Sequence, residues 1–216
     1  KQGTVKKTPV DDFRNIRSNG LKAIQLHDGD ELIHVNIIDG QQNMILGTRL
    51  GYAVSFNAED VRSMGRSAAG VRGAKLREGD CVIGAAPLDS DCNVFVISEN
   101  GFGKQTPAAE YPIKGRGGKG IKTVNVTAKN GPLAGLTTVK GDEDIMLVTD
   151  KGVIIRFGIE TVSQTGRVAV GVHLIRMDDD SKVATMAKVA KEDQTDQDDD
   201  ALPAEEDSAA SETENN

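Results

Sequence analysis

The sequence predicts an all-β protein built as a propeller-like array of about four four-stranded blades. Three observations support this fold class: a repeat of about fifty residues, short runs in which apolar and polar residues alternate, and no apolar period of 3.6 residues over more than two turns. Alternation with a period of two is typical of a strand with one buried face. Four strands per repeat at this spacing match propeller blades, in which radial repetition leaves only short sheet edges.

Two glycine positions define the repeat. The first begins the related segments 3–13, 51–56, 101–111 and 152–157. The second, here called the anchor glycine, is Gly20, Gly70, Gly120 and Gly171, and it precedes the alternating runs 21–26, 71–76, 121–126 and 172–177. The residue two positions after the anchor glycine is basic or His in every copy. We therefore expect each run to be a strand with one buried face and a positive outward row.

Each repeat is expected to hold four strands. Further apolar stretches lie at 32–38, 81–86, 133–139 and 183–189, and a last set at 44–47, 94–97 and 145–148 leads through a turn into the next repeat. The pair Asn100-Gly101 predicts a two-residue hairpin turn in which both residues adopt positive φ. The predicted blades occupy about 1–50, 51–100, 101–151 and 152–190. A strand like 145–148 should precede Lys1, so we expect an array truncated at its N-terminus.

The net charge of −7 is divided unevenly along the chain. Residues 191–216 hold eleven of the 33 acidic residues and one of the 26 basic residues, which leaves 25 bases against 22 acids, a net charge of +3, in 1–190. The tail has almost no large apolar side chains, so it cannot bury enough surface to offset the cost of ordering. We predict a mildly basic body, 1–190, followed by an acidic disordered tail, 191–216.

Composition excludes several classes of protein. No apolar run approaches the roughly 18 residues that a membrane span needs, and no membrane partner is expected. Cys81 and Cys92 make neither a disulfide framework nor a zinc site, so we expect buried thiols in a reducing cytoplasm. The carboxylate runs 27–31 and 178–180 lack a complete ligand spacing. We predict turns there and no metal site.

Glycine and basic residues precede the anchor glycines. The third repeat has the run 114–120, the second and fourth repeats have the shorter relatives 65–70 and 166–171, and the first repeat has Arg17. Glycines let the main chain approach a nucleic-acid backbone, while Arg and Lys supply charge. We predict contacts to duplex DNA without base readout. The candidate contact residues are Arg17, Lys22, Arg66, Arg72, Lys114, Gly115, Arg116, Gly117, Gly118, Lys119, Gly120, Lys122 and Arg167.

The run 114–120 also allows two nucleotide-binding interpretations, and neither fits. Gly115, Gly117 and Gly120 match G-x-G-x-x-G, but that pattern binds a pyrophosphate only between a strand and a helix, and here Pro112 precedes it and a predicted strand follows. No Lys-Ser or Lys-Thr pair follows to make a phosphate loop of the Walker type. A solvated glycine-rich turn whose charges only aid solubility stays open as the alternative.

These residues carry a family resemblance. The run 115–120 with the Ile-Lys-Thr that follows, the stretch 65–73, the fifty-residue repeat and the acidic tail resemble the C-terminal domain of the bacterial DNA gyrase A subunit. The resemblance covers 1–190. It implies a β-pinwheel around which DNA wraps, so that an ATP-dependent type II topoisomerase introduces negative supercoils. The family heptapeptide is Gln-Arg-Arg-Gly-Gly-Lys-Gly, and 114–120 matches five of its seven positions, as a degenerate relative.

The resemblance also implies where the chemistry lies. It places the cleavage tyrosine, ATP and Mg in other parts of the holoenzyme, so neither Tyr52 nor Tyr111 is expected to be catalytic and no cofactor is expected in this chain. The implied partners are duplex DNA, the gyrase B subunit and a second A subunit in a heterotetramer on the bacterial chromosome. The equivalent domain of topoisomerase IV is one alternative. A propeller that serves as a protein-interaction scaffold is another, which the absence of Trp and the presence of only two Tyr disfavour.

Overall fold

The computed structural model describes residues 1–16, 18–177 and 180–191, which contain strands and short 3-10 turns but no α-helix. The strands are β1 (Thr4–Val5), β2 (Asn43–Thr48), β3 (Tyr52–Asn57), β4 (Val71–Arg72), β5 (Val82–Pro87), β6 (Asn93–Ser98), β7 (Phe102–Pro107), β8 (Ile121–Lys122), β9 (Leu133–Val139), β10 (Glu143–Thr149), β11 (Ile154–Gly158), β12 (Val172–His173) and β13 (Val183–Ala190). The 3-10 turns are η1 (Val10–Phe13), η2 (Ala58–Asp60), η3 (Ala108–Glu110) and η4 (Ile159–Thr161). The all-β prediction is confirmed. Of the sequence predictions, those for Arg17, for the carboxylates of 178–179 and for the tail from 192 onward lie outside the described residues.

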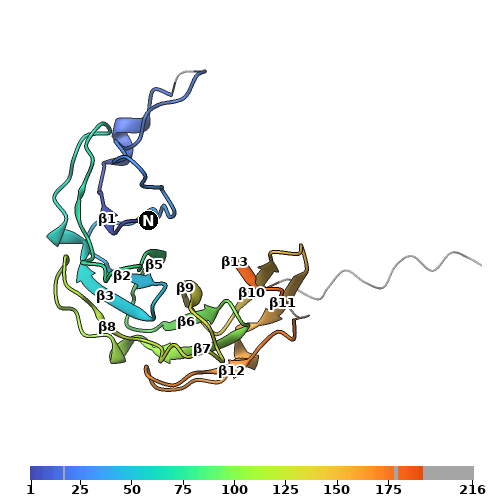
Figure 1. The fold of residues 1–216 in the computed structure, drawn as a ribbon. Coiled ribbons are helices and arrows are strands. Elements are labelled where there is room, and N and C mark those ends of the chain that lie inside the picture. Colours follow the sequence, from blue (N-terminus) through green and yellow to red (C-terminus); the bar gives the residue numbers. More distant parts are fainter. Residues whose placement is uncertain (17, 178–179, 192–216) are drawn as a thin grey trace, which may run out of the picture.

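The strands pair antiparallel in four sheets that follow one another along an arc (Figure 1). Two sheets have four strands, in the orders β5-β2-β3-β8 and β9-β6-β7-β12. A third has the order β13-β10-β11, and β1 pairs with β4. Strands β5, β9 and β13 lie on the concave side of the arc, and β8 and β12 lie on its convex side. The propeller-like array is therefore confirmed, with four strands in two of the sheets that the structure describes.

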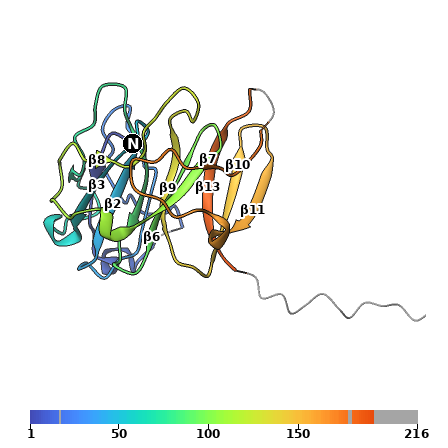
Figure 2. The ribbon, with the colours of Figure 1, turned by 90° about the horizontal axis from the view of Figure 1, so that it is seen from below.

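Neighbouring sheets are interlocked by exchanged strands. After the hairpin β6–β7, the chain runs back to place β8 beside β3 of the preceding sheet, with Ala53 opposite Ile121, and then returns to place β9 beside β6. Strands β4 and β12 are exchanged in the same way, onto β1 and β7. In a view from below, the longer strands of neighbouring sheets run side by side (Figure 2). In three of the four sheets that the structure describes, the outer strand thus comes from the next repeat.

The hairpin β6–β7 turns differently from the sequence prediction. The Ser98 carbonyl accepts a hydrogen bond from the Gly101 amide at 3.0 Å, and Gly101 has φ +81°. Asn100 does not have positive φ, so the predicted two-residue turn is wrong. The loop has three residues, 99–101, and only its last residue is left-handed, as in a turn that ends in a glycine bulge.

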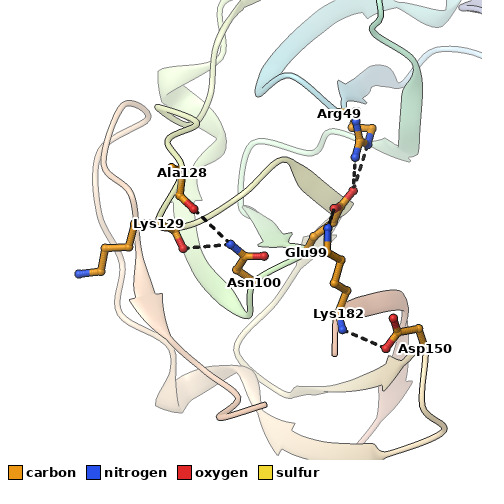
Figure 3. A network of polar contacts seen from close by, with 7 residues as sticks. All are labelled: Arg49, Glu99, Asn100, Ala128, Lys129, Asp150 and Lys182. Carbon is orange, nitrogen blue, oxygen red and sulfur yellow. Dashed lines mark hydrogen bonds and ion pairs between the residues drawn. The ribbon is translucent and has the colours of Figure 1, made fainter. Parts of the chain in front are cut away.

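Polar side chains in these turns tie three sheets together (Figure 3). Arg49 in the β2–β3 turn donates to Glu99 Oε1 with Nε at 3.0 Å and Nη2 at 2.6 Å, and Lys182 before β13 contacts Glu99 Oε2 at 3.2 Å. Asn100 donates its side-chain amide to the Lys129 carbonyl at 3.1 Å, so this residue serves a tertiary contact rather than the predicted turn. Glu99 is only 15 % exposed, so this ion pair network is screened less than a surface pair.

The first repeat forms less sheet than predicted. Neither 21–26 nor 32–38 is a strand. When the repeats are aligned on their anchor glycines, residues 32–37 of the first repeat correspond to β5 of the second. Strand β5 forms its backbone hydrogen bonds with β2. Among the described residues, no strand lies beside 32–37 in the place that β2 takes beside β5, so its backbone has no ladder and Ile37 is 88 % exposed. In the other repeats only the first two residues of each alternating run form a strand.

Aliphatic side chains from neighbouring sheets fill the core. Ile45 of β2, Val94 of β6 and Leu136 of β9 belong to one buried cluster. Phe95 of β6 and Ile145 of β10 belong to the next, and both side chains are fully buried. The core is therefore a series of layers between successive blades, which small aliphatic residues suit and which explains the low aromatic content.

This arrangement predicts that Ile145→Ala lowers the free energy of unfolding by about 2–5 kcal/mol, because it leaves a cavity between two sheets. Ile154→Ala is the matched control: Ile154 is 60 % exposed on the neighbouring strand β11 and should change stability by less than about 0.5 kcal/mol. Urea unfolding of both variants measures the difference. Equal losses would contradict the layered core.

Candidate nucleic-acid interface

Three glycine- and arginine-containing loops lie next to the exchanged strands. We call them the second loop (65–70), the third loop (114–120) and the fourth loop (166–171). Each ends at an anchor glycine directly before β4, β8 or β12. Because β8 and β12 lie on the convex side of the arc, the strand exchange presents the third and fourth loops there (Figure 1).

The anchor glycines are required by packing. Gly70, Gly120 and Gly171 have φ of +101°, +73° and +93°, a conformation that side chains disfavour. A Cβ at each position would lie 2.5 Å from a backbone carbonyl oxygen of the preceding repeat, that of Val5, Ala53 or Gly103 respectively. The end of each loop therefore lies directly against the main chain of the preceding repeat.

The arginines of the third and fourth loops donate hydrogen bonds to carbonyl groups of the preceding repeat. Arg116 donates from Nε to the Asp60 carbonyl at 2.8 Å and from Nη1 to the Arg72 carbonyl at 3.2 Å. Arg167 donates from Nη1 to the Lys122 carbonyl at 3.1 Å. Arg72 and Lys122 both stand two positions after an anchor glycine. Each guanidinium thus has a structural role, which the sequence pattern does not predict.

Main-chain hydrogen bonds attach the loops in the same way. In the third loop, the Gly117 amide donates to the Gly73 carbonyl at 2.6 Å and the Gly118 carbonyl accepts from Lys75 at 2.8 Å. In the second loop, the Ala68 carbonyl accepts from Gln25 at 3.2 Å, the equivalent contact one repeat earlier. The loops therefore run beside the residues that follow the preceding anchor glycine.

These contacts bring the predicted basic residues together in pairs across repeats. Each pair joins the residue two positions after one anchor glycine to the arginine four positions before the next. The pairs are Lys22 with Arg66, which share one small surface depression, Arg72 with Arg116, and Lys122 with Arg167. Lys22, Arg72, Arg116 and Lys122 are exposed, and Arg66 and Arg167 are half-buried. The three pairs follow the order of the blades.

The third loop adds further exposed cations. Lys114 and Lys119 are exposed, and neither side chain hydrogen-bonds or forms an ion pair with another described residue. Main-chain contacts hold both positions: the Lys114 amide donates to the Ser55 carbonyl at 3.0 Å, and the Lys119 carbonyl accepts from Arg77 Nη1 at 2.7 Å. Gly115 has φ of +87° and Gly118 is exposed. This loop presents free ammonium groups on a fixed backbone.

Acidic residues stand beside the pairs. Glu110 Oε2 accepts from the Arg167 amide at 3.1 Å and lies 3.9 Å from its Nε. Asp12 lines the same depression as Lys22 and Arg66. The 3-10 turns η1 and η3 thus place one carboxylate near a basic pair, which weakens its positive potential.

Two lysines, one fully buried and one half-buried, donate to the main chain of the loops, and sequence reasoning missed them. Lys104 on β7 is fully buried and donates from Nζ to the Gly166 carbonyl at 2.6 Å and the Arg167 carbonyl at 2.5 Å. Burial lowers the pKa of Lys104 to about 8, while Glu110 acts in the opposite direction. Lys6 contacts the Arg66 carbonyl at 2.6 Å, and burial lowers its pKa as well.

Other sequence candidates have structural roles. The Tyr111 hydroxyl hydrogen-bonds Thr123 Oγ1 at 2.5 Å, and burial raises its pKa. The Tyr52 ring is covered by the Arg77 guanidinium at 3.2 Å from the ring centroid. Asp30 of the run 27–31 accepts from the Gln2 amide at 2.8 Å. In the described ranges, no three His, Cys, Asp or Glu side chains converge as for a metal ion, and no helix is long and apolar enough to span a membrane.

Sequence comparison relates this chain to one family of proteins. The family model described as DNA gyrase C-terminal domain, beta-propeller, matches residues 1–39, 42–89, 93–140 and 143–190. The DNA gyrase A protein of Staphylococcus epidermidis is 46 % identical over 195 residues, which are 89 % of this chain and 22 % of that protein. Its counterpart in Staphylococcus aureus strain NCTC 8325 is 46 % identical over 202 residues, 92 % of this chain and 23 % of that protein. The chain spans less than a quarter of the length of these curated relatives.

Solved structures share the arrangement of sheets. The C-terminal domain of DNA topoisomerase IV superposes with a TM-score of 0.83 at 26 % identity, over 89 % of this chain and 60 % of that one. A DNA gyrase A C-terminal domain superposes with a TM-score of 0.79 at 26 % identity, over 87 % and 63 %.

The packing of the anchor glycine predicts the effect of a methyl group. Gly120→Ala should lower the free energy of unfolding by about 1–3 kcal/mol, because it combines positive φ with a contact against the Ala53 carbonyl. Gly118→Ala is the matched control in the same loop, since its Cβ would come no closer than 3.9 Å to another atom and its φ is not positive. Thermal or urea unfolding tests both. If Gly120→Ala leaves the free energy of unfolding unchanged, the end of the loop must be free to move away from the Ala53 carbonyl.

The buried ammonium predicts a pH dependence of stability. The pKa of Lys104 is about 8 in the folded chain against an ordinary value of 10.5, so the unfolded state binds more protons between these values. Stability should therefore rise with pH through this window, by about 3 kcal/mol in total from this group. Urea unfolding of the wild type and of Lys104→Met from pH 7 to 10 isolates the contribution as their difference. If the difference in free energy of unfolding between the wild type and Lys104→Met does not change with pH, the lowered pKa of Lys104 is contradicted.

Proposed function

Because the chain belongs to the DNA gyrase C-terminal domain family, we propose that it binds duplex DNA along the convex side of the arc and wraps it without base readout. The observation that carries the proposal is the row of three basic pairs, Lys22 with Arg66, Arg72 with Arg116 and Lys122 with Arg167, at the outer strands of successive blades. Phosphate contacts of this kind orient a duplex and carry no sequence information.

Counterion release favours wrapping on such a surface. Each phosphate that a fixed cation neutralises releases condensed counterions, and a curved row of cations gains more of these contacts when the duplex bends. Bending 20–30 base pairs through 40–90° costs on the order of 1–6 kcal/mol, which several phosphate contacts can offset. The blades supply the curvature, and the interlocked sheets keep it fixed.

The wider role follows from the relatives. We propose that the chain is part of the A subunit of an ATP-dependent type II topoisomerase, in which wrapped DNA gives the crossing that leads to negative supercoils. The gyrase B subunit and a second A subunit are the proposed partners in the cytoplasm, through other parts of the protein. The identity of 46 % to gyrase A proteins favours gyrase over topoisomerase IV, whereas the solved domains of the two enzymes are equally similar to this chain, at 26 % identity each.

No cofactor is assigned to this chain. The third loop is followed by β8 and not by a helix, so it lacks the geometry of a phosphate-binding loop for a nucleotide. We propose that ATP and Mg act elsewhere in the holoenzyme and that Tyr111, whose hydroxyl is held by Thr123, takes no part in DNA cleavage.

Salt dependence tests the DNA-binding role. If the six cations of the three pairs together with Lys114 and Lys119 each neutralise one phosphate, log affinity for a duplex should fall against log salt with a slope of about −7. Fluorescence anisotropy with two duplexes of unrelated sequence measures the slope and the expected lack of sequence preference. A Kd that stays constant between about 50 and about 200 mM salt would overturn the proposal. Ligation of nicked circles with bound protein tests wrapping, which should shift the linking number.

A single lysine variant tests the third loop. Lys119→Ala removes an exposed ammonium that has no described partner, so the slope should become less steep by about 0.9 while the free energy of unfolding stays the same. Lys140→Ala is the matched control: Lys140 is exposed, pairs with Asp91 at 2.9 Å and belongs to none of the loops. A scaffold that binds only proteins would show no duplex binding for any of these proteins.

A further inference from the structure

We propose that Lys104 and Lys6 are positioning residues that hold the fourth and second loops in the shape in which they contact DNA. The inference rests on the proposed function and adds residues that do not themselves touch the duplex. Lys104 is fully buried, so its ammonium group cannot reach a phosphate. It acts only through the loop above it.

The geometry of Lys104 fits this role. Its Nζ donates to two successive carbonyls, of Gly166 at 2.6 Å and of Arg167 at 2.5 Å. Two bonds to adjacent carbonyls fix the orientation of the peptide between them. From the other side, the Arg167 amide donates to Glu110 at 3.1 Å and the guanidinium to the Lys122 carbonyl at 3.1 Å. The whole of Arg167 is thereby held beside Lys122, the other member of its basic pair.

The same device occurs two repeats earlier. Lys6 occupies the equivalent position, three residues after the first glycine of its repeat. Its Nζ donates to the Arg66 carbonyl at 2.6 Å in the second loop and to the Ala23 carbonyl at 2.5 Å beside Lys22. Lys6 therefore joins the main chain of Arg66 to that of Ala23, the residue next to Lys22. The bond from the lysine to the carbonyl of the loop arginine is thus present in both copies, whereas the second acceptor differs.

The blade itself does not require a lysine at this position. The equivalent residues of the second and fourth repeats are Val54 and Ile155, and Val54 is buried in β3. Burying an ammonium group costs free energy that an apolar side chain does not. The third loop, which lies over Val54, is instead held by the two hydrogen bonds of Arg116. The lysines thus accompany particular loops and are not required by the blade.

Preorganisation is the physical benefit. A loop that is ordered before binding loses less conformational entropy when it meets a phosphate backbone. With Lys104 in place, the Ala169 amide also closes the loop onto the Gly166 carbonyl at 3.2 Å. Without the ammonium group, the Gly166 and Arg167 carbonyls lose this donor and the peptide between them is held less firmly.

The experiment compares Lys104→Met with Lys104→Arg in the full 216-residue chain. Lys104→Met should raise the Kd for a duplex by roughly three- to tenfold and make the salt slope less steep by about 0.9, the effect of one lost phosphate contact. Hydrogen exchange of the Ala169 amide should accelerate. Lys104→Arg keeps a cationic donor for both carbonyls and should restore affinity, slope and protection, which a purely space-filling role does not predict.

Lys140→Met is the control for the loss of one positive charge and should leave Kd and exchange unchanged. A folded Lys104→Met with wild-type Kd, slope and exchange overturns the inference. If Lys104→Met does not fold, Lys6→Met decides by the same readouts at the second loop, where an unchanged Kd and exchange overturn it. If the wild type binds no duplex, the proposed function fails, whereas the exchange of Ala169 still shows whether Lys104 holds the loop.

Discussion

The exchange of one short strand between neighbouring sheets determines where the three loops and their basic residues lie. Strand β8 is only two residues long, yet it pairs with β3 of the preceding sheet and carries the third loop to the convex side. The anchor glycine before it makes this possible, since at Gly120 any side chain would strike the Ala53 carbonyl. The curvature of the array, the order of the loops and the pairing of the basic residues all depend on this contact.

The exchange also changes the electrostatics. A repeat taken alone places its two basic residues on one short segment, where they repel each other. In the folded chain Arg116 instead lies beside Arg72 of the preceding repeat and donates to its carbonyl, so the main-chain dipole offsets part of the repulsion. The carboxylate of Glu110 has the same effect near Arg167. The convex side is therefore a row of cations that the fold can hold close together in the absence of DNA.

Sequence reasoning reached the fold because its signals are local. Alternation with a period of two and a glycine at a fixed place in each repeat were enough to predict the all-β array and the loops that contain Arg66, Arg116 and Arg167. The strand exchange is a pairing between repeats, so no local pattern contains it, and the cross-repeat pairs were missed for that reason. Lys104 was missed because a lysine in a strand normally faces solvent. Its departure from Val54 and Ile155 at the equivalent positions was the available signal.

The three loops solve one problem in two ways. A loop that meets phosphates needs exposed donors and a fixed backbone, and glycines supply close approach at the cost of conformational freedom. The third loop has three glycines with positive φ, and arginine and main-chain hydrogen bonds to the preceding repeat restore its order. The second and fourth loops have fewer glycines, and a lysine from beneath orders each of them. In the third loop the hydrogen bonds of Arg116 hold the loop, and Lys114 and Lys119 have no side-chain partner among the described residues. In the fourth loop Lys104 holds the main chain from below, and the half-buried Arg167 donates to the Lys122 carbonyl as Arg116 does to the Arg72 carbonyl. The arginine bond is therefore common to both loops, and the lysine beneath is the additional tie of the fourth.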